Sequence, residues 1–435
     1  MAGDRKPKEQ QGLPEGWKKI RLGDKDYFKI VGSGIEYFEG FKNYLSTNSV
    51  QGTKITHIED VITYKNRPSR ANMQPKKGRL AFARMRNTVK VLLINENLEK
   101  DYILSTGFVL LESKIEPKFV YQYLISDFFN KQKDILAEGT TQEAISNDDL
   151  NRIFIIFPEN KLEQRKIAEI LETVDNAIEK TEKIIEKYKR IKQGLMQDLL
   201  TKGIDENGNI RSEKTHKFKD SPVGRIPEEW EVVRLGEVSK VKRGASPRPI
   251  DDPIFFTEEG KGRAWVRIED VMKSNKYLTE TRQYLSKLGE SKSVKVDVGD
   301  VVMSICATVG KPIIINIPAC IHDGFVVFKN LSHKVDRHFL YYLITFKEKE
   351  IAKLGQIGTQ GNLNSKIVSD FTIPLPPLSE QKRIAEILSQ IDQAIEKEEK
   401  YKEKLERLKK GLMEDLLTGK VRVYKLLEGE NHEKA

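Results

Sequence analysis

The stretch EQRKIAEILETVDNAIEKTEKIIEKYKRIKQGLMQDLLT, residues 163–201, decides the fold because the chain carries it twice. The second copy, EQKRIAEILSQIDQAIEKEEKYKEKLERLKKGLMEDLLT, covers residues 380–418 at a constant offset of 217, and 25 of the 39 positions are identical. Apolar residues recur in both copies at alternating spacings of four and three, which is typical of a coiled-coil seam. We therefore predict two long helices, each about 58 Å in length, that form an antiparallel pair about a pseudo-twofold axis.

Polar residues and glycines interrupt the predicted helices at defined positions. We expect the seam residues Thr181, Lys192, Glu398, Lys402 and Lys409 to fix the register of the pair. Glycine is costly inside a helix, so Gly194 and Gly411, which occupy the same position of each copy, predict that another backbone packs closely there.

The helix ends carry recognisable start and stop signals. Asn160 with Glu163 predicts a capping box for the first helix, and Ser379 predicts the cap of the second. Gly203 and Gly419 predict the stops.

The match between the two copies continues upstream in fragments. LPEGW and IRLG (13–17, 20–23) correspond to IPEEW and VRLG (226–230, 233–236), IEDV (58–61) to IEDV (268–271), GFV (107–109) to GFV (324–326), and Gly139-Thr140 to Gly358-Thr359. Each copy is therefore a globular module followed by a long helix. The predicted organisation is a first module (1–160), first helix (161–202), linker (203–222), second module (223–377), second helix (378–418) and tail (419–435).

The modules alternate short apolar runs with turns, which predicts an α+β fold for each. The predicted strands are Leu80–Ala83, Val89–Asn95, Phe108–Leu111, Val301–Ser304 and Ile313–Ile317. The predicted module helices are Phe119–Phe129 and Arg337–Phe346.

The positive charge is concentrated in the two modules. The formal net charge is +10; residues 1–162 carry 26 Lys and Arg against 21 Asp and Glu, residues 202–379 carry 28 against 23, and the helix copies are nearly neutral. A basic surplus suits a polyanionic partner, although Lys- and Glu-rich thermostable proteins have a similar composition. The sequence has no run of 18 apolar residues and no secretion signal, so we expect a cytoplasmic protein without membrane spans.

The sequence offers no convincing catalytic or metal site. The acidic pairs Glu59-Asp60 and Glu269-Asp270 could indicate the metal site of a nuclease. Adjacent residues of a strand point to opposite faces, however, so the two carboxylates of a pair would not converge on one metal ion. The dipeptide Gly310-Lys311 precedes a proline where a phosphate loop needs Ser or Thr. The six histidines and two cysteines have no metal-ligand spacing. We predict a binding protein with no catalytic residues, metal or cofactor of its own; a nuclease with an unrecognised site is a weaker alternative.

One stretch of the first module is rich in cations and free of acids. Between Val61 and Asn95 there are nine Lys and Arg, interleaved with Asn, Gln, Ser and Thr. Phosphates attract point charges, and base edges pair with Arg, Asn and Gln, so this mixture favours DNA binding. A solvated basic face is the plainer interpretation. The candidate contacts are Arg67, Arg70, Lys76, Lys77, Arg84, Arg86, Asn87 and Lys90, with Arg84 or Arg86 as base readers and the lysine pair on phosphates.

The second module has a thinner set of candidates around the turn Gly244-Ala245-Ser246-Pro247. They are Arg243, Ser246, Arg248, Arg263 and Arg267. A further candidate loop occurs in both modules after a glycine, and its hydroxyl and amide side chains can reach phosphates or bases. Its residues are Thr140, Thr141 and Gln142 in the first module, and Thr359, Gln360 and Asn362 in the second; a plain turn explains these loops nearly as well.

These motifs together resemble the specificity subunits of Type I restriction–modification enzymes. The resemblance rests on Leu13–Gly23, Ile226–Gly236, Phe218–Pro222, the Gly-Thr loops and the twin helices, and it covers nearly the whole chain. The Arg-Gly-x-Ser-Pro turn at Arg243–Pro247 has no counterpart in the first module, where Ile30–Gly34 replaces it.

The resemblance implies two target-recognition domains on an antiparallel coiled coil, each reading one half of a bipartite site in double-stranded DNA. It implies two methyltransferase subunits and restriction/translocase subunits as partners, to which S-adenosylmethionine, ATP and magnesium would belong. The alternative is a coiled-coil scaffold that binds DNA without sequence preference.

Overall fold

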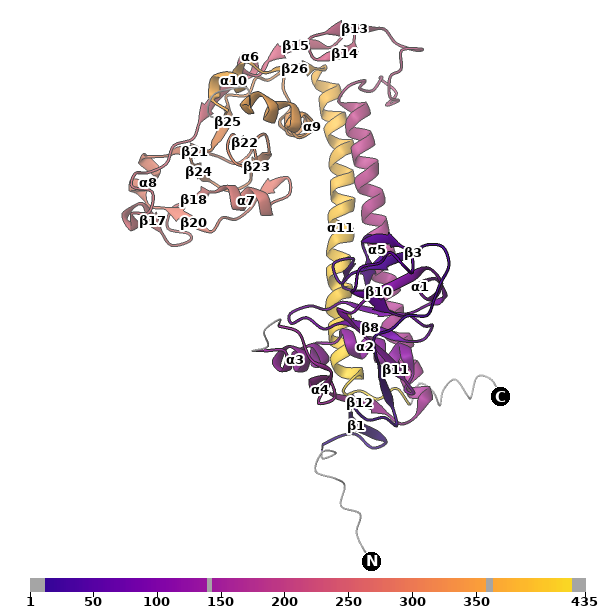
Figure 1. Ribbon diagram of the computed structural model, residues 1–435. Coiled ribbons are helices and arrows are strands. Elements are labelled where there is room, and N and C mark those ends of the chain that lie inside the picture. Colours follow the sequence, from indigo (N-terminus) through magenta and orange to yellow (C-terminus); the bar gives the residue numbers. More distant parts are fainter. Residues whose placement is uncertain (1–11, 139–142, 357–362, 425–435) are drawn as a thin grey trace, which may run out of the picture. The chain divides into compact units, whose positions relative to one another are not determined.

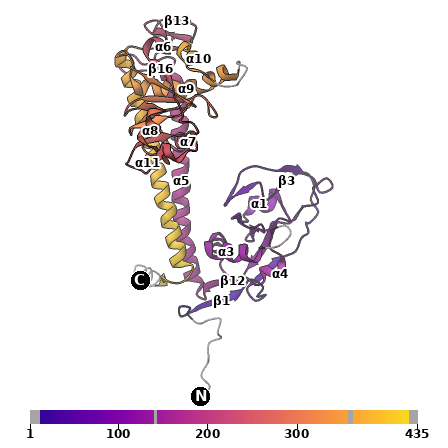
Figure 2. The same cartoon turned by 90° about the vertical axis from the view of Figure 1, so that its left-hand side faces the viewer.

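The computed structural model describes residues 12–138, 143–356 and 363–424. The chain divides into two compact units, Met1–Glu182 with Lys400–Ala435, and Lys183–Glu399. The two dividing points, after residues 182 and 399, differ by the repeat offset of 217. Each unit therefore contains one module, half of the first long helix and the complementary half of the second (Figures 1 and 2).

The first module is built on two four-stranded sheets. One is antiparallel with the order β2-β11-β8-β9 (Phe28–Val31, Phe108–Ser113, Leu80–Ala83, Val91–Leu93). The other has the order β6-β3-β10-β7 (Asp60–Ile62, Lys42–Leu45, Tyr102–Ser105, Ala71–Met73), with β3 and β10 parallel. β1 (Trp17–Arg21) pairs with β12 (Phe154–Pro158) and joins the two ends of the module. The other elements are β4 (Val50–Gln51), β5 (Lys54–Ile55), α1 (Glu96–Asp101), α2 (Pro117–Ile125), α3 (Asp127–Leu136) and α4 (Asn147–Leu150).

The second module repeats this topology with one extra strand in each sheet. One sheet has the order β16-β25-β22-β23-β19 (Lys240–Arg243, Phe325–Lys329, Val301–Ser304, Pro312–Ile315, Tyr277–Leu278). The other is β17-β20-β18-β24-β21 (Phe256–Thr257, Gln283–Leu285, Arg263–Val266, Ala319–Ile321, Val294–Val296), with β18 and β24 parallel. β15 (Glu231–Arg234) and β26 (Thr372–Leu375) close the module as β1 and β12 do. The other elements are α6 (Leu235–Val238), α7 (Ile268–Lys273), α8 (Lys287–Ser291), α9 (Arg337–Gln356), α10 (Ser365–Asp370) and a 3-10 turn at Pro253–Phe255.

Burial explains why the predicted strands form where they do. Every residue of β8, β22 and β23 is buried, and an unbroken apolar run is typical of a strand that is covered on both faces. The predicted helix Phe119–Phe129 is interrupted at Ser126, which ends α2 and caps α3 with its hydroxyl. The predicted linker contains part of a hairpin, β13 (Phe218–Ser221) with β14 (Gly224–Pro227).

The two long helices, α5 (Lys161–Leu199) and α11 (Leu378–Leu416), pack against each other in opposite directions within each unit (Figure 1). In the first unit the start of α5 (Ile167, Leu171) shares a core with the end of α11 (Met413, Leu416). In the second unit the end of α5 shares a core with the start of α11, through Met196, Leu199, Ile384 and Leu388. The predicted antiparallel pairing is confirmed.

Ion pairs across the seam explain three of its polar interruptions, the lysines. Lys409 contacts Asp175 at 2.6 Å, and Lys192 contacts Asp392 at 2.6 Å. These two pairs are the same pair in the two copies of the repeat, because each residue number in one differs by 217 from its counterpart in the other. Lys402 contacts Glu182 at 2.9 Å in the same register. Lysine stems lie along the apolar seam while their ammonium groups reach the partner helix.

The predicted capping interactions of the long helices are wrong in detail. The Asn160 side chain does accept a backbone N–H at 2.9 Å. Glu163 does not complete the capping box, because its carboxylate binds Arg422. Ser379 does not cap α11, since the helix begins at Leu378 and Ser379 lies inside its first turn.

The two glycines that follow the long helices and the two glycines inside them have different surroundings. Gly203 and Gly419 have φ values of +65° and +74° and lie against the rings of Trp230 and Trp17, so a side chain there would be both strained and obstructed. A Cβ at Gly194 or Gly411 would meet no atom of the described residues within 4 Å. The prediction that another backbone packs on these two glycines is wrong for this chain by itself.

The Asp175–Lys409 pair is predicted to fix the register. Reversing one charge (Lys409→Asp) places two partly buried carboxylates side by side and should lower the free energy of unfolding by about 1–2 kcal/mol. Adding Asp175→Lys should restore most of the loss. Urea unfolding of the full chain measures both. Lys410→Asp is the matched control, because Lys410 pairs with Asp127 on an exposed surface and should change stability by less than about 1 kcal/mol. A double variant no more stable than the single one contradicts the prediction.

Candidate nucleic-acid interface

The acid-free stretch of the first module forms β7, β8, β9 and the turns that connect them. Arg70 and Lys76 are exposed, and neither has an ion-pair partner among the residues that the structure describes. Lys77 is also exposed but forms an ion pair with Glu96, at the start of α1. Their exposure leaves Arg70 and Lys76 available to a polyanion.

The turn between β8 and β9 is supported by α3, which supplies the acids that this stretch lacks. Arg86 forms an ion pair with Glu138 just beyond α3 at 3.0 Å. The backbone N–H of Asn87, whose φ is +56°, donates to Asp134 at 3.0 Å. Lys133, which the sequence analysis did not single out, is buried and donates to the Thr88 carbonyl. Burial lowers the pKa of Lys133.

Arg84 and Lys90 are half-buried at the base of the same turn. Arg84 donates to the Asn147 side chain at 2.7 Å and to the Ile145 carbonyl at 3.3 Å, and burial lowers its pKa. Lys90 donates to the Thr47 carbonyl at 2.7 Å. Both side chains hold the module together, so Arg86 is the better placed of the two candidate arginines for an external contact.

Aromatic side chains lie beside Arg67 and were missed by the sequence analysis. The Arg67 guanidinium lies 4.5 Å from the centre of the Tyr64 ring, and the edge-on Tyr37 ring lies 5.1 Å from the same ring. Tyr37 and Phe41 are 66% and 75% exposed. The sequence signal was the aromatic run Tyr37-Phe38 with Phe41 in an otherwise polar loop.

In the second module Asp323 organises the predicted contact turn. Its carboxylate accepts from the Ser246 hydroxyl at 2.6 Å and pairs with Arg248 at 3.2 Å, while its carbonyl accepts from Arg243 at 2.8 Å. The Ser246 hydrogen bond lowers the pKa of Asp323, and the charge of Arg248 lowers it further. The structure therefore brings together three residues predicted from sequence and adds Asp323. The exposed Arg243 and Arg248 are held at a common anchor.

His322 packs beneath this turn between Trp265 and Phe325. Its Nδ1 accepts the Gly324 N–H at 2.8 Å, so this nitrogen carries no proton. Burial, with a smaller contribution from the nearby Arg267, lowers the pKa of His322 to about 4. A neutral His322 is thus part of the scaffold of the turn.

Of the remaining candidates, Arg263 and Arg267 lie in and just after β18, and the others lie outside the described residues. Arg263 ties strands together, donating to the Val296 carbonyl at 3.0 Å and pairing with Asp297. Arg267 is half-buried and donates to Gln283 at 3.3 Å. The Gly-Thr loop candidates Thr140, Thr141, Gln142, Thr359, Gln360 and Asn362 all lie outside the described residues.

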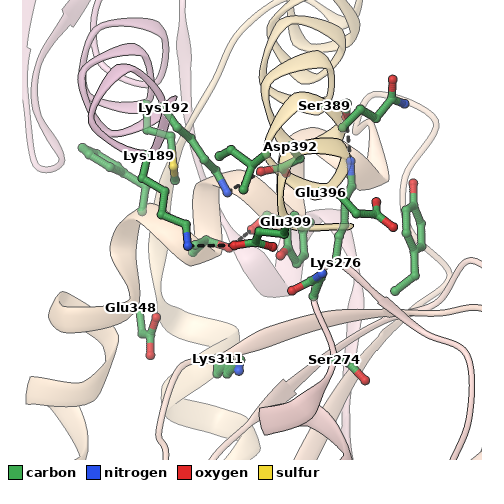
Figure 3. Close-up of a pocket in the computed structure, with 18 of the residues that line it drawn as sticks. Lys189, Lys192, Ser274, Lys276, Lys311, Glu348, Ser389, Asp392, Glu396 and Glu399 are labelled. Atoms are coloured by element: carbon green, nitrogen blue, oxygen red, sulfur yellow. Dashed lines mark hydrogen bonds and ion pairs between the residues drawn. The ribbon is translucent and has the colours of Figure 1, made fainter. Parts of the chain in front are cut away.

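A groove of about 1720 Å³ lies between the second module and the long helices within the second unit (Figure 3). Lys276 projects from the module and donates to Ser389 of α11 at 2.7 Å and to Tyr342 at 3.2 Å. Burial lowers the pKa of Lys276 to about 8. Tyr342 in turn donates to Asp392 at 2.6 Å. The groove residues therefore join module to helix.

The described residues at the candidate turns offer hydrogen-bonding and cationic groups. Among them, no group of three His, Cys, Asp or Glu could hold a metal ion. No described helix is long and apolar enough to cross a membrane.

Comparisons with known proteins agree in one family. The family model "Type I restriction modification DNA specificity domain" matches residues 14–190 and 227–407. The chain is 32% identical over 462 residues to the Type I restriction enzyme MjaVIII specificity subunit of Methanocaldococcus jannaschii, with 96% of each chain covered. A solved structure on complex assembly of the type I R-M system aligns with a TM-score of 0.59 and 25% identity over 94% of this chain and 99% of the other. The S subunit from M. genitalium shares the fold, with a TM-score of 0.58 and 16% identity over 94% and 98% of the two chains.

The buried His322 predicts a pH-dependent loss of stability. Its pKa is about 4 in the folded chain and 6.5 when exposed, so the unfolded chain binds more protons between these values. The stability from neutral His322 is full above pH 6.5 and falls as the pH drops toward 4, by about 3 kcal/mol in total. Urea unfolding of the wild type and His322→Gln at pH 7 and pH 4.5 measures this difference. If both lose stability equally, His322 is not responsible.

Proposed function

Because the chain belongs to the Type I restriction–modification DNA specificity family, we propose that it is the non-catalytic subunit that reads a bipartite DNA target, one half-site per module. The observation that carries this proposal is the contrast between the copies. The helices are nearly the same in both, and the two modules share their strand topology. The positions of the polar residues at the candidate turns, and the groups that hold them, differ between the modules.

Different groups on the same framework suit two unlike half-sites. In the first module the candidate turn presents Arg86 from a base held by α3, and in the second it presents Arg243 and Arg248 around Asp323. Arginine pairs with guanine edges in the major groove, whereas lysine contacts phosphates without reading sequence. A scaffold without sequence preference would have no need of two chemically distinct turns.

The partners and cofactors follow from the same proposal. Two methyltransferase subunits would use the two equivalent faces of the repeated helices, and restriction/translocase subunits would complete the assembly. S-adenosylmethionine, ATP and magnesium would then be bound by those subunits. This chain would recognise the DNA target and hold the other subunits together.

Mapping of methylated sites tests the assignment of one module to one half-site. Arg86→Ala should relax the first half-site only and Arg248→Ala the second only, each by about 1–3 kcal/mol of discrimination. The two variants are controls for each other. Lys76→Ala should weaken binding of all sequences alike and reduce the salt dependence by about one counterion. A wild-type complex whose methylated sites show no bipartite motif would refute the proposed function itself.

The helices are expected to set the spacer between the half-sites. Four residues inserted after Glu182 and four after Glu399 lengthen both helices by one turn, about 6 Å, at equivalent points of the repeat. A four-residue insertion is a stutter, which the helix pair absorbs by unwinding locally. The spacer should grow by one or two base pairs, since one pair spans about 3.4 Å, with both half-sites unchanged. The same insertion between Pro222 and Val223, in the hairpin turn, is the control and should leave the spacer alone.

A further inference from the structure

Each long helix has the dipeptide Glu-Gln in its first turn, and both side chains of each dipeptide are buried. Gln164 and Gln381 are 2% and 0% exposed, and Glu163 and Glu380 are 1% and 7% exposed. A buried polar side chain is costly unless its hydrogen bonds are made. The partners of these four side chains therefore show what the start of each helix is joined to.

The glutamines join each helix to its own module at two places. In the first unit the Gln164 Oε1 accepts the Glu116 N–H at the start of α2 at 2.9 Å, and its Nε2 donates to the Pro158 carbonyl at the end of β12 at 2.8 Å. In the second unit the Gln381 Oε1 accepts the Asp336 N–H at the start of α9 at 2.9 Å.

The Nε2 of Gln381 completes the equivalent contacts in the second unit. It donates to the Pro376 carbonyl just beyond β26 at 2.7 Å and to the Lys334 carbonyl at 2.9 Å. In both units the glutamine amide therefore makes the same two connections. One is to the end of the strand that closes the module, β12 or β26, and the other is to the start of a module helix, α2 or α9.

The glutamates join each helix start to the segment that leaves the other helix. Glu163 is held by Arg422, six residues after α11, at 2.7 and 2.9 Å. Glu380 is held by Arg211, which follows α5, at 2.5 and 3.2 Å. Glu380 also accepts from Trp230 at 3.2 Å. A bidentate arginine fixes the carboxylate in both position and orientation.

Each Glu-Gln dipeptide is therefore a junction of three parts: the helix that contains it, the module before it, and the exit of the antiparallel helix. An amide that accepts from one element and donates to another restricts rotation between them, because both bonds must be kept in line. A purely apolar contact between the same elements is non-directional and would allow them to slide.

We propose that Gln164 and Gln381 are positioning residues that fix the angle of each module on the helix pair, and thereby restrict the complex to one spacer between its half-sites. This inference rests on the proposed function. On this proposal the length of the helices sets the separation of the modules, while the hydrogen bonds of Gln164 and Gln381 hold each module at one angle to the helices. The glutamate–arginine pairs keep the two helix ends together, so that the angle is defined against both helices.

The test uses the whole complex, coexpressed with its methyltransferase partner, and maps methylated sites. Gln164→Glu keeps the shape and still accepts from Glu116, but its carboxylate cannot donate to Pro158. We expect unchanged half-sites, with the preference for the original spacer over spacers one base pair longer or shorter reduced by about tenfold. Gln381→Glu should act in the same way from the other module.

Gln132→Glu is the matched control. Gln132 makes the same kind of two-way amide contact, to Phe154 at 3.0 and 3.1 Å, but it joins α3 to β12 inside the first module. It should lower the melting temperature to a similar degree and leave the spacer unchanged. If Gln164→Glu does not fold, Gln164→Met, which keeps the volume without a charge, is expected to loosen the spacer likewise.

The outcomes separate the inference from the proposed function. A bipartite wild-type motif together with unchanged spacers in the Gln164 and Gln381 variants would overturn the inference and leave the function standing. A weaker preference for the original spacer in the Gln132 variant as well would also overturn the inference, because a general loss of stability would then explain the change. The absence of a bipartite motif in the wild type would instead remove the proposed function on which the inference rests.

Discussion

The antiparallel register of α5 and α11 is the constraint on which the rest of the structure depends. Asp175 meets Lys409 and Lys192 meets Asp392, so the same ion pair occurs twice along this register. Such pairs add little stability when exposed. Inside an apolar seam, however, a shift of register leaves a charge unpaired, and that cost selects one alignment. Once this alignment is set, each module packs on the start of one helix and the end of the other.

The modules show how one framework can carry different surfaces. Their two sheets share the order of four strands and one parallel pair, the second module adds one strand to each sheet, and their cores are built from buried strands. The turns above these cores are held by unrelated groups: Lys133 and Asp134 of α3 in the first module, and Asp323 with the neutral His322 in the second. Because the supporting groups belong to each module alone, the surface of one can change without disturbing the other.

The sequence predicted what depends on periodicity and repetition. The helices, their direction, the strands of continuous apolar residues and the role of Lys192 and Lys409 all follow from patterns within or between the copies. The sequence did not predict contacts between residues that are far apart along the chain. Glu163 looked like a capping residue, but its partner Arg422 is 259 residues away.

The candidate site shows the same limit. The acid-free stretch predicted a strongly cationic surface, yet Glu138 pairs with Arg86 and Glu96 with Lys77 from outside it. Asp323 and the exposed aromatic residues were not foreseen, because a lone Asp or a short aromatic run has no distinctive pattern. The prediction for Gly194 was wrong, since a glycine present in both copies indicated a close neighbour that the described residues of this chain do not provide.

The order of the elements along the chain also has a consequence for synthesis. The first long helix is complete at Leu199, but its partner begins at Leu378. At about 5–20 residues per second, translation of the intervening segment takes roughly 10–40 s. Throughout that interval the apolar seam of α5 has no intramolecular partner, while the helix already carries both Asp175 and Lys192. The same helix on a neighbouring ribosome presents a complementary face, so a nascent chain must avoid its own copies until its second half has emerged.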